Sequence, residues 1–196
     1  MKIIVIGSTG TIGSAVVKAL AAHEVIGLHR KSTPALDIEA ADSIAAAFAA
    51  IGNVDAVISC TGSGAFAPLD KLTDDDFAKS LRGKLMGQVN VIRHAIPHVN
   101  DNGSITVTSG VMAREPMTGG AAISMINGGI EGFVIGAALE APRGIRINAV
   151  SPPWITETLI AFKMDASHGQ PADAAAKVYA GVVTGNQRGQ IVDTRK

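Results

Sequence analysis

The chain has 196 residues, and 47% of them are hydrophobic, which suits one globular domain with a sizeable core. Its 17 basic and 17 acidic residues give a net charge of zero, so there is no electrostatic basis for a nucleic-acid or membrane-surface partner. One Cys cannot form an internal disulfide, and the N-terminus "MKIIVIGSTG" lacks the separate apolar region of a leader peptide. No apolar run is both long enough and free enough of glycine to predict a membrane span. Because the single Cys favours a reducing compartment, we expect a cytoplasmic protein.

Apolar runs and segments of helical periodicity alternate along the chain. About seven strands are predicted, at 2–6, 24–30, 34–37, 54–60, 103–109, 144–150 and 189–193. Helices are predicted at 10–23, 39–52, 73–99, 119–140 and 171–183. The third helix opens with Thr73 and Asp76 at the positions of a capping box. This alternation predicts one α/β domain over 1–196, with a Rossmann-like, doubly wound parallel sheet and helices on both of its faces.

The loop "GSTGTIG" joins the first predicted strand to the first helix and spaces Gly7, Gly10 and Gly13 three residues apart. The first glycine permits a tight turn, and a later one allows the helix to pack closely on the strand. Backbone N–H groups at the helix N-terminus would then face a pyrophosphate. The position of the loop favours a dinucleotide site over a glycine-rich turn with no ligand.

The second strand ends in His29-Arg30-Lys31, and no acidic residue follows until Asp37. A carboxylate at the end of this strand would bind a ribose hydroxyl and favour NAD, whereas a guanidinium matches a 2′-phosphate. We therefore predict that NADP is preferred over NAD, through Arg30 and the hydroxyls of Ser8 and Thr9. The alternative is that Arg30 is a solvated charge at the end of a strand.

With these motifs in place, nearly the whole chain resembles the short-chain dehydrogenase/reductase family. "GSITVTSG" is similar to that family's fifth strand, and "GGIEGFVIGAALEAPRGIRINAVSPPWITET" is similar to its following helix, sixth strand and Pro-Gly loop. "SCTG" stands where the family has Asn-Asn-Ala-Gly, and Asp37-Ile38 resembles its adenine-side pair. The resemblance implies an NADP-binding oxidoreductase that acts on a small carbonyl or alcohol substrate. The cofactor-binding residues that follow from the loop and the resemblance are Gly7, Ser8, Thr9, Gly10, Ile12, Gly13, Arg30, Asp37, Ile38, Cys60, Thr61, Gly62, Pro152, Ile155 and Thr156.

The four catalytic residues of that family, Asn, Ser, Tyr and Lys, are not found at their positions in this sequence. Alignment through "GGIEGF" places Ile123 at the Tyr position and Asn127 at the Lys position. Gly110 falls at the Ser position, with Ser109 one residue earlier, and Lys84 falls at the Asn position. In the family the Tyr hydroxyl transfers the substrate proton, which an alkyl chain cannot do. We therefore predict an atypical active site with little or no ordinary carbonyl reductase activity.

The Asn and Lys of that family are both present but exchanged between two helices. One hypothesis is that Lys84, Asn127 and Ser109 converge on a polar cavity beside the nicotinamide, which makes them the candidate catalytic groups. The alternative is two independent changes, with Lys84 extending to solvent. Two functions correspond to this choice: an oxidoreductase with rearranged chemistry, or a non-catalytic NADP(H)-binding sensor or partner subunit.

Other residues support less specific expectations. Cys60 and Tyr179 are expected to be packing residues, and no set of His or acidic residues predicts a metal site. Arg114 is expected either to bind an anionic substrate or to form a surface salt bridge. The apolar helices at 74–98 and 119–140 predict a homodimer or homotetramer. A short substrate loop is expected around 153–172, with an apolar pocket wall formed by Met112, Met117, Trp154 and Ile155.

Overall fold

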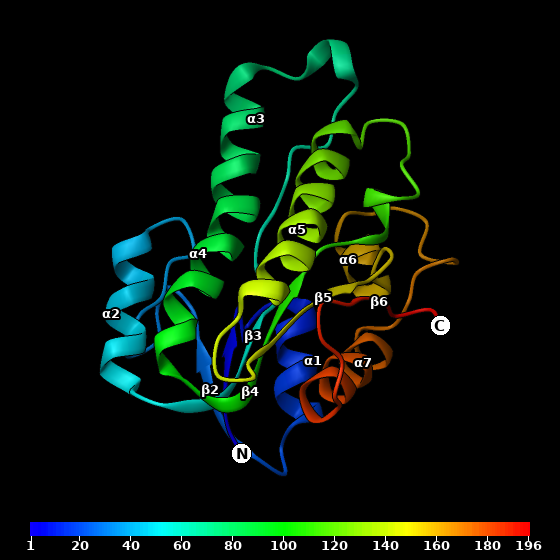
Figure 1. Ribbon diagram of the computed structural model, residues 1–196. Coiled ribbons are helices and arrows are strands. Elements are labelled where there is room, and N and C mark those ends of the chain that lie inside the picture. Colours follow the sequence, from blue (N-terminus) through cyan, green and yellow to red (C-terminus); the bar gives the residue numbers. More distant parts are fainter.

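A parallel sheet of six strands lies between two layers of helices in the computed structural model, which describes residues 1–196 (Figure 1). The strands are β1 Lys2–Ile6, β2 Glu24–Leu28, β3 Val54–Ser59, β4 Val99–Thr108, β5 Arg146–Ser151 and β6 Ile191–Asp193. The α-helices are α1 Thr11–Ala19, α2 Ala41–Ile51, α3 Asp74–Ser80, α4 Gly87–Ala95, α5 Ala121–Glu140, α6 Thr156–Ala161 and α7 Ala172–Thr184. The predicted Rossmann-like α/β class is confirmed.

The strand order places a ligand-binding crevice at one point of the sheet. In the order β2-β1-β3-β4-β5-β6, the chain moves to one side from β1 to β2 and to the other side from β3 onward. In open α/β sheets, ligands bind at the carboxyl ends of the strands where the order reverses. The ends of β1 and β3 form that point here, and Figure 1 shows α3 and the start of α5 extending beyond the sheet.

The predicted strand at 34–37 is wrong, which accounts for the difference between seven predicted strands and six observed ones. These residues form irregular chain after β2, and of the four only Leu36 is fully buried. The N–H of Leu36 donates to the carbonyl of His29 at 3.0 Å, so the segment is anchored to the end of β2 instead of pairing along a neighbouring strand. One buried apolar residue can anchor a loop, but a strand needs apolar residues repeated along it, alternately or in a continuous run.

The two faces of the sheet bury alternate residues of the same strand. Along β1, Ile4 and Ile6 belong to the core cluster beneath α2, α4 and α5, whereas Ile3 and Val5 belong to the cluster beneath α1 and α7. Successive side chains of a strand point to opposite faces. A strand covered on both sides therefore needs a continuous apolar run, which is what the sequence "KIIVI" provides.

The predicted helix at 73–99 is interrupted in its middle. Its start is as predicted, because Asp76 N–H donates to Thr73 Oγ1 at 3.2 Å and Thr73 N–H donates to Asp76 Oδ2 at 2.9 Å. After α3, however, residues Leu81–Met86 form a π-helical segment, and α4 follows it. π-Helical turns are rare and frequently lie at functional sites. This one carries Lys84, whose side chain is buried.

Helix α5 is long and apolar enough, by length and composition alone, to cross a membrane. In this fold it covers the sheet, with Ile130 and Val134 in the core between the helices and the strands. Its buried face also carries Asn127 and Glu131, both of which are hydrogen-bonded within the protein. The place of α5 against the sheet therefore explains the apolar residues on one of its faces, whereas Met125, Ile135 and Leu139 are exposed.

Candidate active site

The glycine-rich loop forms a tight turn between β1 and α1. Gly7 has φ +80°, a left-handed conformation that favours glycine, and its N–H donates to the carbonyl of Leu28 at 2.8 Å. A Cβ on Gly13 would lie 2.0 Å from the carbonyl oxygen of Gly7, so helix and turn touch at this point. No side chain caps the N-terminus of α1, and its first turn holds no acidic residue. The exposed N–H groups of α1 are therefore available to an anion.

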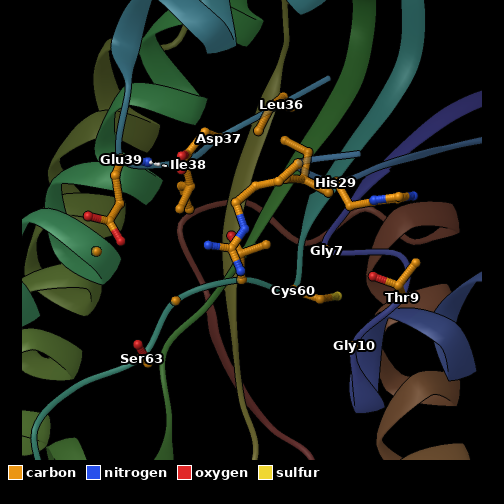
Figure 2. Close-up of a pocket in the computed structure, with 15 residues that line it drawn as sticks. Gly7, Thr9, Gly10, His29, Leu36, Asp37, Ile38, Glu39, Cys60 and Ser63 are labelled. Carbon is orange, nitrogen blue, oxygen red and sulfur yellow. Dashed lines mark hydrogen bonds between the residues drawn. The ribbon is translucent and has the colours of Figure 1, made fainter. Parts of the chain in front are cut away.

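A first pocket of about 370 Å³ opens beside this turn, at the ends of β1, β2 and β3. Figure 2 shows Thr9 and Gly10 on one side of it and the segment from Leu36 to Glu39 on the other. Arg30 also lines this pocket and forms no salt bridge with any carboxylate. The pocket is therefore polar, with an unpaired guanidinium at its rim.

A second pocket of about 410 Å³ continues from the first, along the ends of β4 and β5. Residues 60–63, which follow β3, line both pockets, so the two form one cleft across the carboxyl edge of the sheet. The second pocket is the more apolar of the two, and its walls come from the loops after β3, β4 and β5 and from the start of α5. A cleft of this length would hold an extended ligand with a polar half and an apolar half.

Twelve of the fifteen residues predicted to bind the cofactor line this cleft. In the first pocket they are Gly7, Thr9, Gly10, Arg30, Asp37 and Ile38, in the second Ile12, Pro152 and Ile155, and in both Cys60, Thr61 and Gly62. The other three lie elsewhere for identifiable reasons. Ser8 Oγ donates to the Leu28 carbonyl at 3.4 Å, Gly13 packs on the turn, and Thr156 N–H donates to the Gln170 carbonyl at 2.9 Å.

Lys84 and Asn127 meet at the inner end of the second pocket. Lys84 Nζ donates to Asn127 Oδ1 at 2.8 Å and to the Ser109 carbonyl at 3.0 Å. Lys84 is 9% exposed, and burial lowers the pKa of its amine to about 8. The alternative in which Lys84 extends to solvent is therefore wrong, and the structure brings together the three residues singled out from the sequence.

Ser109 takes part through its backbone and not through its hydroxyl. Ser109 Oγ donates to Glu131 Oε1 at 2.9 Å, and Glu131 Oε2 accepts from Arg114 Nη1 at 2.5 Å. Arg114 also donates to Ser151 Oγ at 3.0 Å. Arg114 thus forms a salt bridge, one of its two expected roles, but its partner Glu131 is buried and not at the surface as expected. The Glu131 carboxylate also holds the Ser109 hydroxyl away from Lys84.

Cys60 and Tyr179 have the packing roles expected from the sequence. Burial raises the pKa of the Cys60 thiol to about 12, which leaves it protonated at neutral pH. Tyr179 is fully buried in α7, and burial raises the pKa of its phenol well above the usual value. Because Thr108 Oγ1 donates to the Ser59 carbonyl, Tyr179 must donate the 2.7 Å hydrogen bond that joins it to Thr108. Neither side chain provides an ionised group to the cleft.

The apolar wall of the second pocket contains residues that sequence patterns did not identify. Trp154, Ile155 and Met112 line it as expected, but Met117 does not and instead contacts Trp154 Nε1 through its sulfur at 3.2 Å. Phe66 and Phe162 also line the pocket, and Phe66 lies edge-on to Trp154 with ring centroids 5.9 Å apart. Phe162 lies within the substrate loop expected around 153–172, whereas no signal in the sequence places Phe66 beside it.

Comparisons with known proteins agree with this fold. The chain matches the family model described as enoyl-(acyl carrier protein) reductase over residues 10–188. The crystal structure of the protein lin1944 from Listeria innocua is 40% identical, with a TM-score of 0.94 and 98% of each chain covered. A crystal structure described as a small-chain dehydrogenase in complex with NADPH is 26% identical, with a TM-score of 0.86 and 97% and 94% of the two chains covered.

Curated relatives match over shorter stretches. The hydroxynaphthalene reductase-like protein Arp2 of Metarhizium brunneum is 29% identical over 103 residues, which are 52% of this chain and 39% of that protein. The glucose and ribitol dehydrogenase homolog 2 of Arabidopsis thaliana is 26% identical over 110 residues, which are 56% of this chain and 38% of that protein. The chain thus covers about two fifths of the length of these curated relatives.

Proposed function

We propose an NADP(H)-dependent oxidoreductase function for this chain, which belongs to the short-chain dehydrogenase/reductase family. The observation that carries the proposal is the continuous cleft, which runs from the uncapped N-terminus of α1 to the buried Lys84–Asn127 pair. The glycine turn would hold the pyrophosphate, the first pocket the adenosine half and the second pocket the nicotinamide with a small carbonyl substrate. When bound, the cofactor supplies the hydride.

The charges around the first pocket support NADP over NAD. Two carboxylates line this pocket, but both have partners: Asp37 Oδ1 accepts from Glu39 N–H at 3.0 Å, and Glu39 Oε2 accepts from Arg82 Nε at 3.1 Å. Arg30 alone is unpaired, and its guanidinium suits a 2′-phosphate. The related small-chain dehydrogenase was crystallised with NADPH, the phosphorylated cofactor.

This preference is tested with Arg30→Ala and with Arg93→Ala as a matched control, since Arg93 is exposed on α4 outside the cleft. One charge-assisted hydrogen bond contributes about 1.5–3 kcal/mol, so Arg30→Ala should weaken NADPH binding about tenfold or more. NADH binding should be nearly unchanged, and Arg93→Ala should alter neither. Titration monitored by the intrinsic fluorescence of NADPH and NADH measures the dissociation constant of each dinucleotide. Equal losses for the two dinucleotides would show that Arg30 does not bind the 2′-phosphate.

Lys84 is the group best placed to act on the substrate oxygen. Its ammonium has three N–H donors, of which two are used by Asn127 Oδ1 and the Ser109 carbonyl. The third is left for a ligand in the second pocket. A pKa of about 8 leaves the amine largely protonated at neutral pH but able to release a proton, as a general acid requires. In this proposal Asn127 and Ser109 position the ammonium, and Lys84 donates to the oxygen of the carbonyl.

The activity is tested by NADPH oxidation over a panel of aldehydes, ketones and quinones. Loss of a general acid lowers turnover by about 10²–10⁴-fold, so Lys84→Met should abolish most of any activity found. Lys79→Met is the control, because Lys79 is exposed and pairs with Asp75 on α3. Brisk turnover that Lys84→Met leaves unchanged would show that the proton comes from another source.

A non-catalytic NADP(H)-binding sensor or partner subunit is the second candidate. The observation that favours it is the alkyl side chain of Ile123, which lines the second pocket where the resemblance implies the catalytic Tyr. Tight NADPH binding without turnover on any member of the panel would support this function.

Restoration of the family's catalytic residues separates the two candidates further. Single changes should recover little activity, because catalytic groups that act as a unit are not additive. The structure adds two requirements: a Cβ on Gly110 would lie 2.8 Å from Asn127 Nδ2, and Asn127→Lys would place a second amine beside Lys84. The combined change Gly110→Ser, Ile123→Tyr and Asn127→Lys should therefore gain most when Lys84→Asn is included. Equal activity with and without Lys84→Asn would contradict the repulsion argument.

A further inference from the structure

The charge and the walls of the second pocket define a class of substrate. We propose that this pocket selects compact aromatic ligands that carry a phenolate oxygen, bound by Lys84, and that its reducible substrates are quinones, whose oxygen becomes a phenolate when hydride is added. This inference rests on the proposed function, since it takes the second pocket as the substrate end of the cleft.

The size and walls of the pocket favour a flat apolar body. Its volume of about 410 Å³ lies at the lower end of the range for small-molecule sites. Phe66, Trp154 and Phe162 line it together with Ile123 and Met112. Aromatic side chains interact favourably with other rings in edge-to-face and offset geometries, as Phe66 and Trp154 already do with each other. A ligand of one or two fused rings fits these walls.

Lys84 is the only charged residue that lines the second pocket, and no carboxylate neutralises it. Glu131, which is one turn along α5 from Asn127, is paired with Arg114 and with the Ser109 hydroxyl instead. The two acceptors of the lysine, an amide oxygen and a backbone carbonyl, are both neutral. A buried cation without a counter-ion is destabilised, so an anionic oxygen in the pocket would be bound strongly.

A phenolate matches this site better than an alkoxide does. The pocket contains no ionised side chain besides Lys84 and no exposed Tyr, so nothing near the amine would replace a proton that it gave up. A phenol ionises near pH 10, and an anionic oxygen within hydrogen-bond reach offsets the burial that lowers the pKa of Lys84 to about 8, so the proton stays on the amine. An aliphatic alkoxide is far more basic than a phenolate and would take that proton at once. A product oxygen that is stable as an anion needs only the hydrogen bond and the charge of Lys84.

The chemical step balances without a further reagent. The quinone accepts a hydride, with its two electrons, from NADPH, which is oxidised to NADP⁺. The hydride bonds to one quinone oxygen, which becomes a hydroxyl, and an electron pair moves through the ring to the other oxygen. That oxygen is left as the phenolate of a hydroquinone monoanion, held by the Lys84 ammonium. The monoanion takes one proton from solvent after it leaves the pocket.

Binding of 4-nitrophenol to the protein without cofactor tests the site directly. The ionised form of this probe is coloured. Its absorbance at a pH below the pKa of the free probe therefore reports whether the pocket stabilises the phenolate. 4-Nitroanisole is the uncharged control ligand, and quenching of Trp154, the single Trp, reports occupancy for both. Wild type and Lys79→Met should bind 4-nitrophenol in its coloured form. They should bind it at least tenfold more tightly than 4-nitroanisole, because one charge-assisted hydrogen bond contributes a factor of about ten or more in affinity. In Lys84→Met, or Lys84→Gln if the first variant does not fold, the colour and the preference should both disappear.

Turnover of a matched pair of substrates completes the test. With NADPH, kcat/KM for 1,4-naphthoquinone, corrected for the uncatalysed reaction, should exceed that for α-tetralone, which yields an alkoxide. Lys84→Met should lower the value for the quinone at least tenfold, whereas Lys79→Met should leave it unchanged. Equal binding of the two nitro compounds by wild type, or a preference that survives the loss of Lys84, would overturn the proposal. NADPH fluorescence, measured in parallel, distinguishes failure of the proposed function from failure of the phenolate site. A protein that does not bind NADPH refutes the proposed function, whereas the nitrophenolate absorbance tests the second pocket independently of the cofactor.

Discussion

The contact between Gly13 and the glycine turn makes a sharp test of how the nucleotide end of the cleft is built. An added Cβ at Gly13 would lie 2.0 Å from the carbonyl oxygen of Gly7 and 2.7 Å from its carbonyl carbon. Both are backbone atoms, so no side chain can rotate to relieve the overlap. Gly13→Ala must therefore move α1 and the turn apart. Overpacking of this kind costs about 1–3 kcal/mol.

The two measurable consequences follow from that displacement. For a chain of this size, 1 kcal/mol corresponds to about 2–4 °C in melting temperature, so Gly13→Ala should melt about 2–12 °C below the wild type. NADPH affinity should fall at least tenfold, because the N–H groups of the turn and of α1 no longer converge on one site. Calorimetry and NADPH fluorescence titration measure the two effects.

Gly181→Ala provides the matched control, since it makes the same chemical change on an exposed face of α7. An added Cβ there meets nothing within 4 Å. Alanine is the better helix former, so this variant should gain up to about 1 kcal/mol in stability and bind NADPH like the wild type. If Gly13→Ala melted at the wild-type temperature and kept its NADPH affinity, the close packing of turn and helix would not be what shapes this end of the cleft.

Three further predictions concern the interior and the surface. Burial lowers the pKa of Lys84 from 10.5 to about 8, so between these values the unfolded chain binds more protons and folding stability rises with pH. From pH 8 to pH 9, urea unfolding should show the wild type gaining about 1 kcal/mol relative to Lys84→Met, since the ionisation of Cys60 in the unfolded chain is common to both proteins. A constant difference in stability would contradict the buried cation. Tyr179→Phe deletes the hydrogen bond to Thr108, which contributes about 1 kcal/mol, so the melting temperature should fall by about 2–4 °C while NADPH binding is unchanged. A simultaneous loss of NADPH binding would mean that Tyr179 also shapes the cleft. Light scattering at micromolar concentration should give a dimer or tetramer, because Leu139 on α5 is 84% exposed within an apolar face, and a monomer would refute this.

Features governed by short-range rules could be predicted from the sequence. The glycine turn, the Thr73–Asp76 capping box and the apolar strand at 2–6 each depend on a few neighbouring residues, and each lies where it was expected. The order of strands and helices then fixes the class of fold, because parallel strands need helical crossovers. The edge at which a ligand would bind follows from the same rule.

Features that depend on side-chain direction or on distant contacts could not be predicted. Ser8 was expected to face the nucleotide, but its hydroxyl satisfies the Leu28 carbonyl inside the turn. Ser109 was expected among the catalytic groups, but Glu131 holds its hydroxyl, and only its backbone carbonyl contacts Lys84. Position along the chain gives the neighbourhood of a residue, whereas the partner of its side chain is decided by elements far away in the sequence.

The π-helical segment 81–86 also changes the phase between the helices on either side of it. Each residue advances an α-helix by about 100°, so one extra residue in a turn rotates everything after it by about that amount. A residue-by-residue comparison with an uninterrupted helix is therefore correct on only one side of the segment and is displaced by one residue on the other. Counting along the helix therefore cannot establish which residue of a relative corresponds to Lys84. The correspondence is defined by position in space, since the Lys84 amine lies beside Asn127 and the Ser109 carbonyl.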